Sequence, residues 1–431
     1  MIRRVRVQGY KSLKDVEIRL RPLTVFMGPN GAGKSNLFDA LGLLSRAVTC
    51  ENLLDAFKGH RGAPLEAFYY GDQGLKGLSR QPSVQFTIEV DVELSAGVME
   101  SVEQLVREVR EGLPEKSRTP AESGRRRIIE SSLRYTLTIQ MAVDSGHLRV
   151  TRERLVALTK DGVEKSPQSR KAFVEPVGGR LRLRAEGQQR PTEHEVGLDR
   201  TLVATRHYPP HYPHITAFRE ELSRWAFYYF DPETMRAETP LKKSETLGPF
   251  GADMASFYAS LKSRDARQFT AINAALRTLM PSAGSLDVVR TDRGYLKLEL
   301  SENGVPFSAT LISEGTLRVL GLLAITNPLA STTVIGYEEP ENGVHPRRLR
   351  LIADLIKNAA QFGKQPLINT HSPILPEYFD PADLVVCSKE RGETSFAPFR
   401  DLGPLLQKVE ISKALEETPL RERLMRGDFG G

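Results

Sequence analysis

The stretch Gly28-Pro29-Asn30-Gly31-Ala32-Gly33-Lys34-Ser35 matches the pattern G-x-x-x-x-G-K-[ST] at every fixed position. The apolar run Leu23–Met27 precedes it as a strand, and a helix is predicted behind it over residues 34–47. Glycines let successive backbone N–H groups converge on phosphate oxygens at the positive end of such a helix. We therefore expect Lys34 to reach the β- and γ-phosphates of a nucleotide and the Ser35 hydroxyl to ligate Mg²⁺.

The expected ligands follow from this P-loop. ATP and Mg²⁺ are the cofactors that such a loop binds. Chance clustering of glycines would not explain a strand and a helix on the two sides of the motif, so we prefer the phosphate-binding interpretation. The residues expected to contact the nucleotide from the loop and the first helical turn are Asn30, Gly31, Gly33, Lys34, Ser35 and Asn36.

A second segment, residues 333–346, reads Thr-Val-Ile-Gly-Tyr-Glu-Glu-Pro-Glu-Asn-Gly-Val-His-Pro, an apolar strand that ends in two carboxylates. Taken alone, these acids are also typical of a surface turn after a buried strand. Their position after a P-loop favours a catalytic interpretation. Glu338 is then the candidate that holds the Mg²⁺ shell together with Ser35, and Glu339 the candidate that orients or deprotonates the attacking water.

A third segment, Leu367-Ile368-Asn369-Thr370-His371-Ser372-Pro373, is a short strand that ends in a histidine. It lies one strand–helix–strand step beyond the two acids. His371 is therefore predicted to hydrogen-bond the γ-phosphate and to report whether that phosphate is present.

A fourth segment, Leu311-Ile312-Ser313-Glu314-Gly315-Thr316, opens an apolar helix over residues 317–325. A helix N-terminus with serine and glycine in front of it is a second candidate anion site. Ser-x-Gly before a helix is also common capping, so this segment is weak by itself.

Together the four segments resemble the ABC-class ATPases of the RecF, SMC and OLD groups, over roughly residues 1–95 and 225–400. The resemblance is carried by Gly-Lys-Ser-Asn at 33–36, Ser-Glu-Gly-Thr at 313–316 and Glu-Pro-Glu-Asn-Gly-x-His-Pro at 339–346. It implies that two copies meet head to tail as a homodimer or a higher homo-oligomer. The residues that would then bind the γ-phosphate held by the other copy are Ser313, Gly315 and Thr316.

The resemblance has further implications and some departures. Gly9-Tyr10-Lys11-Ser12-Leu13 is similar to a motif in which a basic residue and a serine approach the nucleotide. Glu338 stands where an aspartate is usual, and Glu314 stands where a glycine is common. The candidates for a glutamine loop, among which the sequence does not choose, are Gln73, Gln81 and Gln85.

Apolar periodicity predicts an α/β chain. The expected strands cover residues 2–8, 16–26, 83–94, 132–142, 147–157, 180–184, 225–230, 284–290, 294–301, a segment from 332, and 366–370. The expected helices cover 34–47, 97–112, 215–224, 252–262, 265–279, 314–326 and 346–360. Heptads are not sustained, so we expect no long coiled coil.

The spacing of the motifs suggests an insertion. About 300 residues separate Ser35 from Glu338, far more than a transporter ATPase subunit uses, which argues against the transporter class. We therefore expect an ABC-type head made of 1–95 and 201–431, with an inserted α+β subdomain at 96–200. Only 60 residues follow His371, so we expect no toprim nuclease domain and assign any nuclease action to a separate partner.

Charge is unevenly distributed along the chain. The net charge is +6, yet residues 125–190 contain 15 Lys/Arg against 7 Asp/Glu. Such an excess is typical of contact with a polyanion such as DNA, although charged runs are more often simply solvated. Two widely separated cysteines and the lack of a signal peptide or membrane-spanning run favour a cytoplasmic protein.

Three functions remain open at this point. The motif Tyr229-Phe230-Asp231-Pro232 with Arg236, and the closing residues 427–431, resemble stand-alone ATPases that often serve antiphage defence beside a nuclease or toxin. The leading hypothesis is an ATPase that regulates such an effector. The alternatives are a RecF-like DNA repair or recombination ATPase and an ATP-gated scaffold with negligible hydrolysis.

Overall fold

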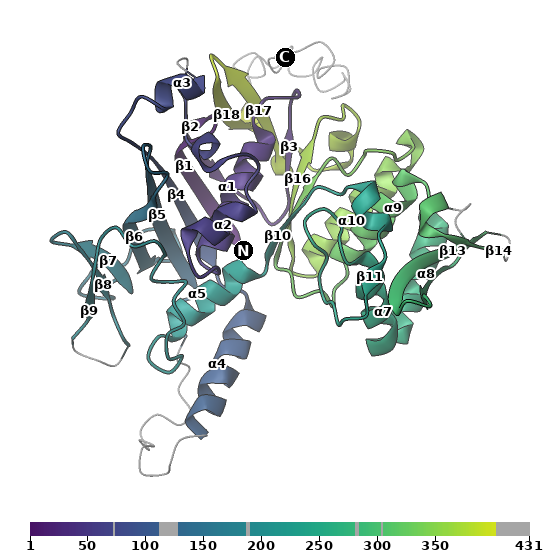
Figure 1. The fold of residues 1–431 in the computed structure, drawn as a ribbon, viewed down its shortest axis with the longest axis horizontal. Helices are drawn as coiled ribbons and strands as arrows, with labels where there is room; N and C mark the ends of the chain where they lie inside the picture. The colour runs from purple at the N-terminus through teal and green to yellow at the C-terminus, as the bar shows by residue number, and fades with distance from the viewer. Residues whose placement is uncertain (72–73, 112–127, 187–189, 281–283, 303–304, 402–431) are drawn as a thin grey trace. The chain divides into compact units, whose positions relative to one another are not determined.

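The computed structural model describes residues 1–401 apart from 72–73, 112–127, 187–189, 281–283 and 303–304 (Figure 1). These residues form two compact units. The first combines Met1–Arg21, Ser35–Trp225 and Lys389–Phe396. The second combines Pro22–Lys34, Ala226–Ser388 and the described residues from Ala397 onward. The chain therefore changes unit between Lys34 and Ser35, inside the P-loop motif.

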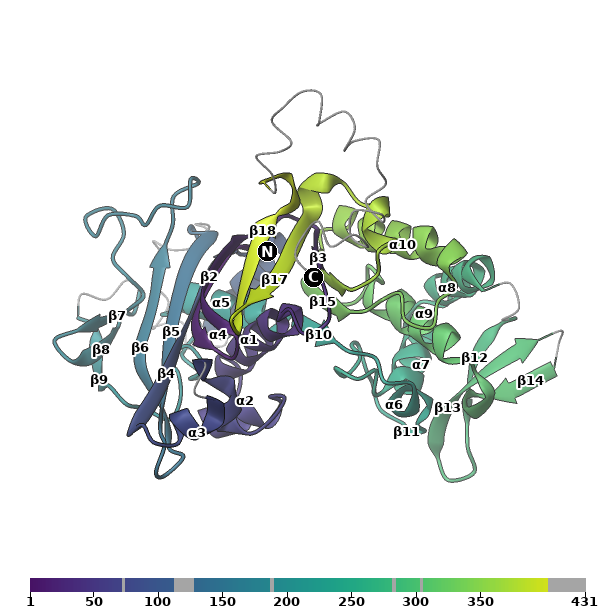
Figure 2. The same cartoon turned by 90° about the horizontal axis from the view of Figure 1, so that it is seen from above.

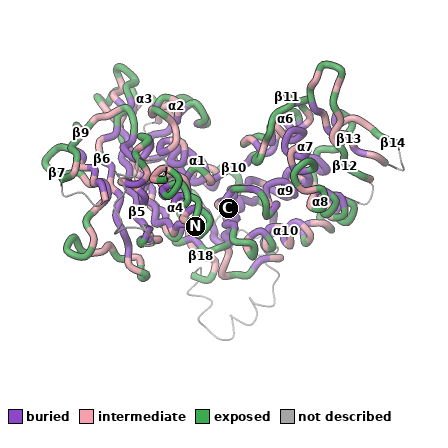
Figure 3. Tube along the Cα trace, turned by 90° about the horizontal axis from the view of Figure 1, so that it is seen from below, coloured by how far each residue is buried: buried purple, intermediate pink, exposed green. Residues whose placement is uncertain are grey.

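The first unit is built on an antiparallel sheet with the strand order β2-β1-β4-β5-β6-β7-β8-β9 among the described residues. On β4, Val84, Phe86, Ile88 and Val90 are buried and alternate with more exposed residues. This period of two is expected for a sheet with one face on a core (Figure 3). The strands are β1 (Ile2–Tyr10), β2 (Leu13–Arg19), β4 (Ser83–Glu93), β5 (Ser132–Ala142), β6 (Leu148–Ala157), β7 (Val174–Val177), β8 (Arg180–Leu183) and β9 (Thr192–Glu195).

Helices cover the buried face of this sheet. The α4 helix packs against α5, and the longest described helix, α4, has 16 residues. No long coiled coil is present among the described residues, as the sequence predicts. The helices are α1 (Lys34–Ala47), α2 (Leu53–Lys58), α3 (Gly74–Leu78), α4 (Ala96–Glu111) and α5 (Pro213–Ser223).

A second sheet has the order β10-β15-β16-β3-β17-β18, in which β15, β16, β3 and β17 are parallel. Its strands β3, β15 and β16 belong wholly to the second unit, whereas Trp225 and residues 389–396 are assigned to the first. Parallel strands are covered on both faces, and every residue of β3, β15 and β16 is buried. The strands are β3 (Thr24–Met27), β10 (Trp225–Tyr228), β15 (Val334–Glu338), β16 (Gln365–Thr370), β17 (Leu384–Glu390) and β18 (Glu393–Pro398).

A smaller sheet packs beside helix α7 in the same unit (Figure 2). Its strands are β11 (Thr239–Pro240), β12 (Leu286–Arg290), β13 (Tyr295–Glu302) and β14 (Val305–Ser308). The helices of this unit are α6 (Pro232–Arg236), α7 (Met254–Arg264), α8 (Ala266–Leu279), α9 (Glu314–Ile325) and α10 (Leu349–Gln361). The α9 helix is almost wholly buried in the core, which explains why its sequence is apolar on all sides.

The α/β class and most of the predicted elements are confirmed. One predicted strand is wrong in extent: residues 16–26 form two strands, β2 and β3, separated at Pro22. Proline lacks the N–H group that a continuous ladder needs, and the chain changes unit at this position. Residues 96–200 contribute α4 and β5–β9, which extend the sheet of β1, β2 and β4. The domain boundaries at 95/96 and 200/201 stay a prediction.

Among the described residues, no helix combines the length and the apolar character that a bilayer crossing requires.

One buried carboxylate of the first unit links the sheet to a later segment of the chain. Glu153 on β6 is buried, and its Oε1 accepts hydrogen bonds from the Tyr135 hydroxyl at 2.9 Å and the Val203 N–H at 3.0 Å. Its Oε2 accepts from the Leu202 N–H at 2.6 Å. Burial raises the pKa of Glu153 to about 7, although the three donors act in the opposite direction. Glu153 thus ties the segment 202–203 to the sheet.

This carboxylate predicts a pH dependence of stability. Its pKa of about 7 in the fold exceeds the ordinary value of 4.5, so the unfolded chain binds fewer protons between these values. The free energy of unfolding should therefore fall as the pH rises from 4.5 to 7 and then level off. In urea titrations, the difference in the free energy of unfolding between wild type and Glu153→Gln should decrease by about 2–3 kcal/mol between pH 5 and pH 8.

Glu164→Gln is the matched control for this measurement. Hydrogen bonding to Arg154 lowers the pKa of Glu164 despite partial burial, so its contribution is lost only as the pH falls below the ordinary carboxylate range. Its difference from wild type should be flat between pH 5 and pH 8. A flat difference for Glu153→Gln as well would contradict the assignment.

Candidate nucleotide-binding site

The P-loop connects β3 to α1 and runs against the backbone of β17. Gly28 has φ +152°, and a Cβ there would lie 2.1 Å from the carbonyl oxygen of Cys387. Only glycine fits at such a close approach. The Cys387 thiol donates to the carbonyl oxygen of Ala32 at 3.3 Å, and burial raises the pKa of this thiol to about 12. Cys387 is therefore an uncharged packing partner of the loop.

The tip of the loop is open. Asn30 and Gly31 are exposed, and a Cβ on Gly31 would meet nothing within 4 Å. Gly31 and Gly33 both have positive φ, +80° and +100°, so the loop takes the left-handed conformations that its glycines allow. Ser35 follows as a half-buried residue of α1.

Lys34 turns back over the loop. It is 8 % exposed, and its Nζ donates to the carbonyl oxygens of Gly28 at 2.7 Å and Pro29 at 2.9 Å. Burial lowers the pKa of Lys34, and nearby carboxylates act against this effect. Those carboxylates are Glu339, Glu341 and Glu338. The lysine and the two acids predicted from the sequence therefore belong to one electrostatic site.

The two acids differ in their setting. Glu338, the last residue of β15, is 8 % exposed. Glu339 leaves the strand with a left-handed φ of +53°, which is uncommon for a residue with a side chain. Its N–H donates to the carbonyl oxygen of Asn369 at 2.8 Å, and its Oε2 accepts from the Asn342 amide. These contacts hold the carboxylate of Glu339 beyond the end of the strand.

His371 and Glu339 are brought together, as the sequence interpretation requires. His371 Nδ1 lies 3.2 Å from Glu339 Oε1 and 3.9 Å from Glu341 Oε1. Glu341 is a site residue that the sequence interpretation missed. Its Oε1 accepts from the Thr370 hydroxyl at 2.5 Å and from the backbone N–H groups of His371 at 3.3 Å and Ser372 at 3.1 Å. The only sequence signal was its place two residues after Glu339, in Glu-Pro-Glu.

The fourth segment, residues 311–316, which we call the signature segment, caps α9. Ser313 Oγ accepts from the Thr316 N–H at 3.3 Å and lies 2.8 Å from its hydroxyl. Ser313 and Glu314 are exposed, whereas Gly315 and Thr316 are buried. A Cβ on Gly315 would lie 2.0 Å from the carbonyl oxygen of Gly343, in the loop that follows the acids. The exposed polar groups of this segment are therefore the Ser313 hydroxyl and the Glu314 carboxylate, and Leu311 is exposed beside them.

Asn36 and the N-terminal motif, residues 9–13, form hydrogen bonds with other residues of the protein. Asn36 Nδ2 donates to Ser12 Oγ at 2.7 Å, and Ser12 Oγ lies 2.6 Å from the Thr394 hydroxyl on β18. The Lys11 ammonium bonds to the Asp39 carboxylate and to the carbonyl oxygen of Arg61. These contacts all lie within the first unit. Nucleotide contact by Asn36, Lys11 and Ser12 stays a prediction.

The basic residues of 125–190 are largely paired with carboxylates. Three of the partners, Glu89, Asp91 and Glu193, come from outside the segment, so the charge excess counted along the chain overstates the charge in space. Arg125 to Arg127 lie outside the described residues. The paired basic residues are Arg134, Arg154, Lys165, Arg170, Arg180, Arg182 and Arg184.

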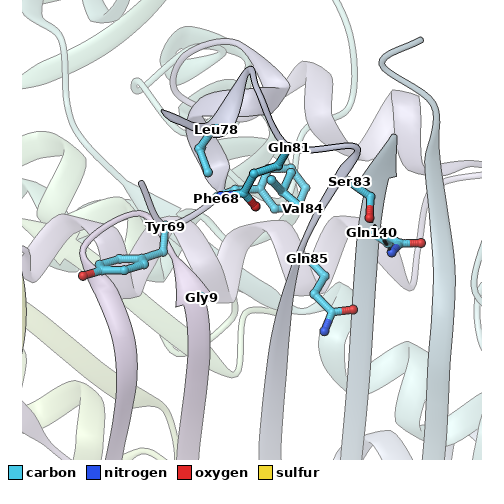
Figure 4. A pocket seen from close by; sticks show the side chains of 9 residues that line it. All are labelled: Gly9, Phe68, Tyr69, Leu78, Gln81, Ser83, Val84, Gln85 and Gln140. Carbon is cyan, nitrogen blue, oxygen red and sulfur yellow. Dashed lines mark hydrogen bonds between the residues drawn. The ribbon is translucent and has the colours of Figure 1, made fainter. Parts of the chain in front are cut away.

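Two glutamine-loop candidates line a cavity of about 460 Å³ in the first unit (Figure 4). Gln81 and Gln85 are exposed at its wall, beside Gln140, whose Nε2 donates to Ser83 Oγ at 3.0 Å. Gln73 lies outside the described residues. The glutamine loop therefore stays unassigned.

Two family models match the chain. One, described as "AAA ATPase domain", covers residues 1–121, and one, described as "AAA domain, putative AbiEii toxin, Type IV TA system", covers 170–375. The chain is 34% identical over 95 residues to a DNA replication and repair protein RecF from Phocaeicola vulgatus, covering 20% of this chain and 26% of that protein. It is 41% identical over 44 residues to an OLD nuclease from Thermus scotoductus, covering 10% and 8%.

Among solved structures, an SMC head bound to the C-terminal winged-helix domain of ScpA superposes with a TM-score of 0.53 at 13% identity, covering 92% of this chain and 97% of that one. The two family models, the curated relatives and the shared fold together support a RecF/SMC/OLD-like ABC-class ATPase. The fold is that of an ABC-type head, as predicted. The chain spans only a small part of the curated relatives that it matches.

The residues present fit a nucleotide with Mg²⁺. The loop glycines leave room for phosphate at the tip, Lys34 supplies the positive charge, and Glu338 supplies a buried carboxylate. In addition, the buried side-chain amide of Asn369, next to Glu338 in the sheet register, has no partner among the described residues. A hard, hydrated cation suits such oxygen donors.

The close approach at Gly28 predicts a difference between two loop glycines. Gly28→Ala should lower the free energy of unfolding by about 2–4 kcal/mol, because its Cβ would overlap the Cys387 carbonyl. Gly31→Ala changes backbone strain alone and should cost about 1–2 kcal/mol. Chemical denaturation measures both. Equal losses would show that packing on Cys387 is not what requires glycine at position 28.

Proposed function

We propose that the protein binds Mg-ATP and hydrolyses it. The observation that supports this most is the convergence of three strand ends: β3 leads to the P-loop, β15 ends at Glu338, and β16 ends before His371. These strands are adjacent and parallel. A lysine, two carboxylates and a histidine therefore meet at one edge of the sheet, which is the group of side chains that phosphoryl transfer to water needs.

Each residue has a role in this proposal. The Lys34 ammonium exchanges the carbonyl oxygens of Gly28 and Pro29 for β- and γ-phosphate oxygens. Ser35 and Glu338 hold the Mg²⁺ shell. Mg²⁺, when bound, neutralises charge that develops on the phosphates. Glu339 accepts the proton of the attacking water.

His371 contributes on the other side of the same carboxylate. Its Nδ1 faces Glu339, and its second ring nitrogen is the group we assign to the γ-phosphate. Glu341 holds the backbone of His371 and so orients it.

A second copy completes the site in this proposal. Ser313 and Gly315 bind the γ-phosphate held by the other chain, so nucleotide drives head-to-tail dimerisation. The exposed Ser313 hydroxyl at the N-terminus of α9 supports this role, because it combines a hydroxyl donor with the positive end of a 12-residue helix.

The biological role proposed first is regulation of a partner effector, a nuclease or toxin, in antiphage defence. The family model over residues 170–375, whose description refers to a toxin of a Type IV system, supports this role. An ATP-gated scaffold with negligible hydrolysis would differ from this ATPase only in its rate of ATP turnover. A phosphate-release assay distinguishes the scaffold from the ATPase.

Two substitutions test the ATPase proposal. Lys34→Ala should weaken ATP binding by at least about 100-fold, because charge-assisted hydrogen bonds to phosphate are lost. Glu339→Gln should bind ATP normally, lower phosphate release by about 100-fold or more, and accumulate an ATP-dependent dimer in light scattering. Glu390→Gln, which changes an exposed acid at the end of β17, is the control. Unchanged phosphate release in Glu339→Gln would refute the role of Glu339.

The relation to RecF favours a second candidate, a DNA repair or recombination ATPase. It predicts ATP-dependent binding to DNA that weakens steeply with salt. Arg152, Lys160 and Lys171 are exposed in the basic segment. Replacing all three by alanine should reduce the slope of log affinity against log salt by about 3, measured by fluorescence anisotropy. An unchanged slope would exclude this segment as the DNA contact.

A further inference from the structure

Asn369 is a buried polar residue whose side-chain amide makes no hydrogen bond within the described residues. It is 2 % exposed, and neither its Oδ1 nor its Nδ2 has a hydrogen-bond partner among the described residues. A buried amide without partners is costly, and proteins retain one only where something else satisfies it. The backbone of the same residue is fully used, because its carbonyl oxygen accepts from the Glu339 N–H at 2.8 Å.

Another buried asparagine of the same unit shows what a structural role looks like. Asn273 is 8 % exposed. Its Nδ2 donates to the carbonyl oxygens of Phe269 at 3.3 Å and Leu286 at 3.2 Å, and its Oδ1 accepts from the Leu286 N–H at 2.6 Å. The amide of Asn273 is therefore saturated by protein groups, whereas that of Asn369 is not.

The register of the sheet places the Asn369 amide beside the metal candidate. Asn369 is paired with Glu338 on β15 and with Phe26 on β3, two residues before Gly28 of the P-loop. Paired residues of adjacent parallel strands project from the same face of the sheet. The Asn369 and Glu338 side chains are thus neighbours on one face, at the edge from which the P-loop departs.

The chemistry of the amide selects its occupant. Oδ1 accepts hydrogen bonds, so it does not suit a phosphate oxygen, which also accepts. A water bound to Mg²⁺ is a strong donor, and Mg²⁺ usually keeps several of its waters in proteins. Nδ2, in contrast, donates and suits a carboxylate or a phosphate oxygen. A hydrated Mg²⁺ next to Glu338 offers both kinds of partner at once.

We propose that Asn369 is a positioning residue for hydrated Mg²⁺: its Oδ1 accepts a hydrogen bond from a metal-bound water that Glu338 also holds. The inference rests on the proposed Mg-ATP binding and assigns to this site a residue outside the P-loop, the acids and the histidine. Glu338 carries its carboxylate one methylene farther from the strand than an aspartate would. An amide on the adjacent strand then restrains the water from a second direction.

The test compares ATP affinity with Mg²⁺ and with EDTA in Asn369→Leu, a substitution of similar size. In EDTA, we expect the variant to bind ATP with an affinity within about twofold of wild type. The factor by which Mg²⁺ increases the ATP affinity should fall by about 10–100-fold, which is the usual effect of removing an outer contact to a metal site. We also expect the melting temperature without nucleotide to be equal to or higher than that of wild type, because an unsatisfied amide is removed.

Asn273→Leu is the matched control. It removes a saturated amide, so its melting temperature should fall by several degrees while the ratio of the two affinities stays at the wild-type value. If Asn369→Leu does not fold, Asn369→Ala takes its place and must show the same loss of Mg²⁺ dependence.

The outcomes separate the two proposals. Wild-type protein that binds no ATP under either condition would refute the proposed function and the inference with it. Wild-type protein whose Mg²⁺-dependent strengthening survives in Asn369→Leu or Asn369→Ala would refute the inference alone. A lowered melting temperature with equal losses in Mg²⁺ and EDTA would assign Asn369 to the fold instead of the metal.

Discussion

The shared register of three buried parallel strands is the constraint on which the site depends. The strands β3, β15 and β16 run in the same direction, so their carboxyl ends meet at one edge. The side chains of these strands are packed on both faces, and a slip of one residue in the pairing would move Glu338 to the opposite face. The packing of the three strands therefore sets where the acids, the lysine and the histidine lie, and the loops set only the orientation of their side chains.

The motifs at the ends of these strands were predictable, because each joins a required residue type to a local pattern. Lys34, Glu338 and His371 follow strands that apolar runs reveal. Glu341 and Asn369 were not predictable as site residues, because their roles depend on which atoms meet across strands. The same reason explains the basic segment: charge counted along the chain misses Asp91, which accepts from Arg134 across the β4–β5 ladder at 2.6 Å.

The buried polar groups at Glu153 and at the candidate site differ in how they are paired. In the first unit, Glu153 is surrounded by donors from the sheet and from the segment 202–203, so its carboxylate holds the fold together. In the second unit, Glu341 Oε1 accepts several hydrogen bonds, but its Oε2 and the Asn369 amide are buried and have no partner in the described part of the chain. Other buried atoms without a partner among the described residues, such as Arg46 Nη2 and Ser95 Oγ, lie in the first unit. What distinguishes Asn369 and Glu341 is that their atoms lie beside the acids at the ends of β15 and β16.

The contact between Gly315 and Gly343 joins the signature segment to the loop that follows the acids. A Cβ on either residue would lie close to the backbone of the other, so two main chains touch with no side chain between them. Side chains can absorb small movements by changing rotamer, but backbone in van der Waals contact cannot. The position of the loop after Glu339 is therefore coupled directly to the N-terminus of α9, where Ser313 and Glu314 are exposed. Any side chain larger than hydrogen at either glycine would force these two segments apart.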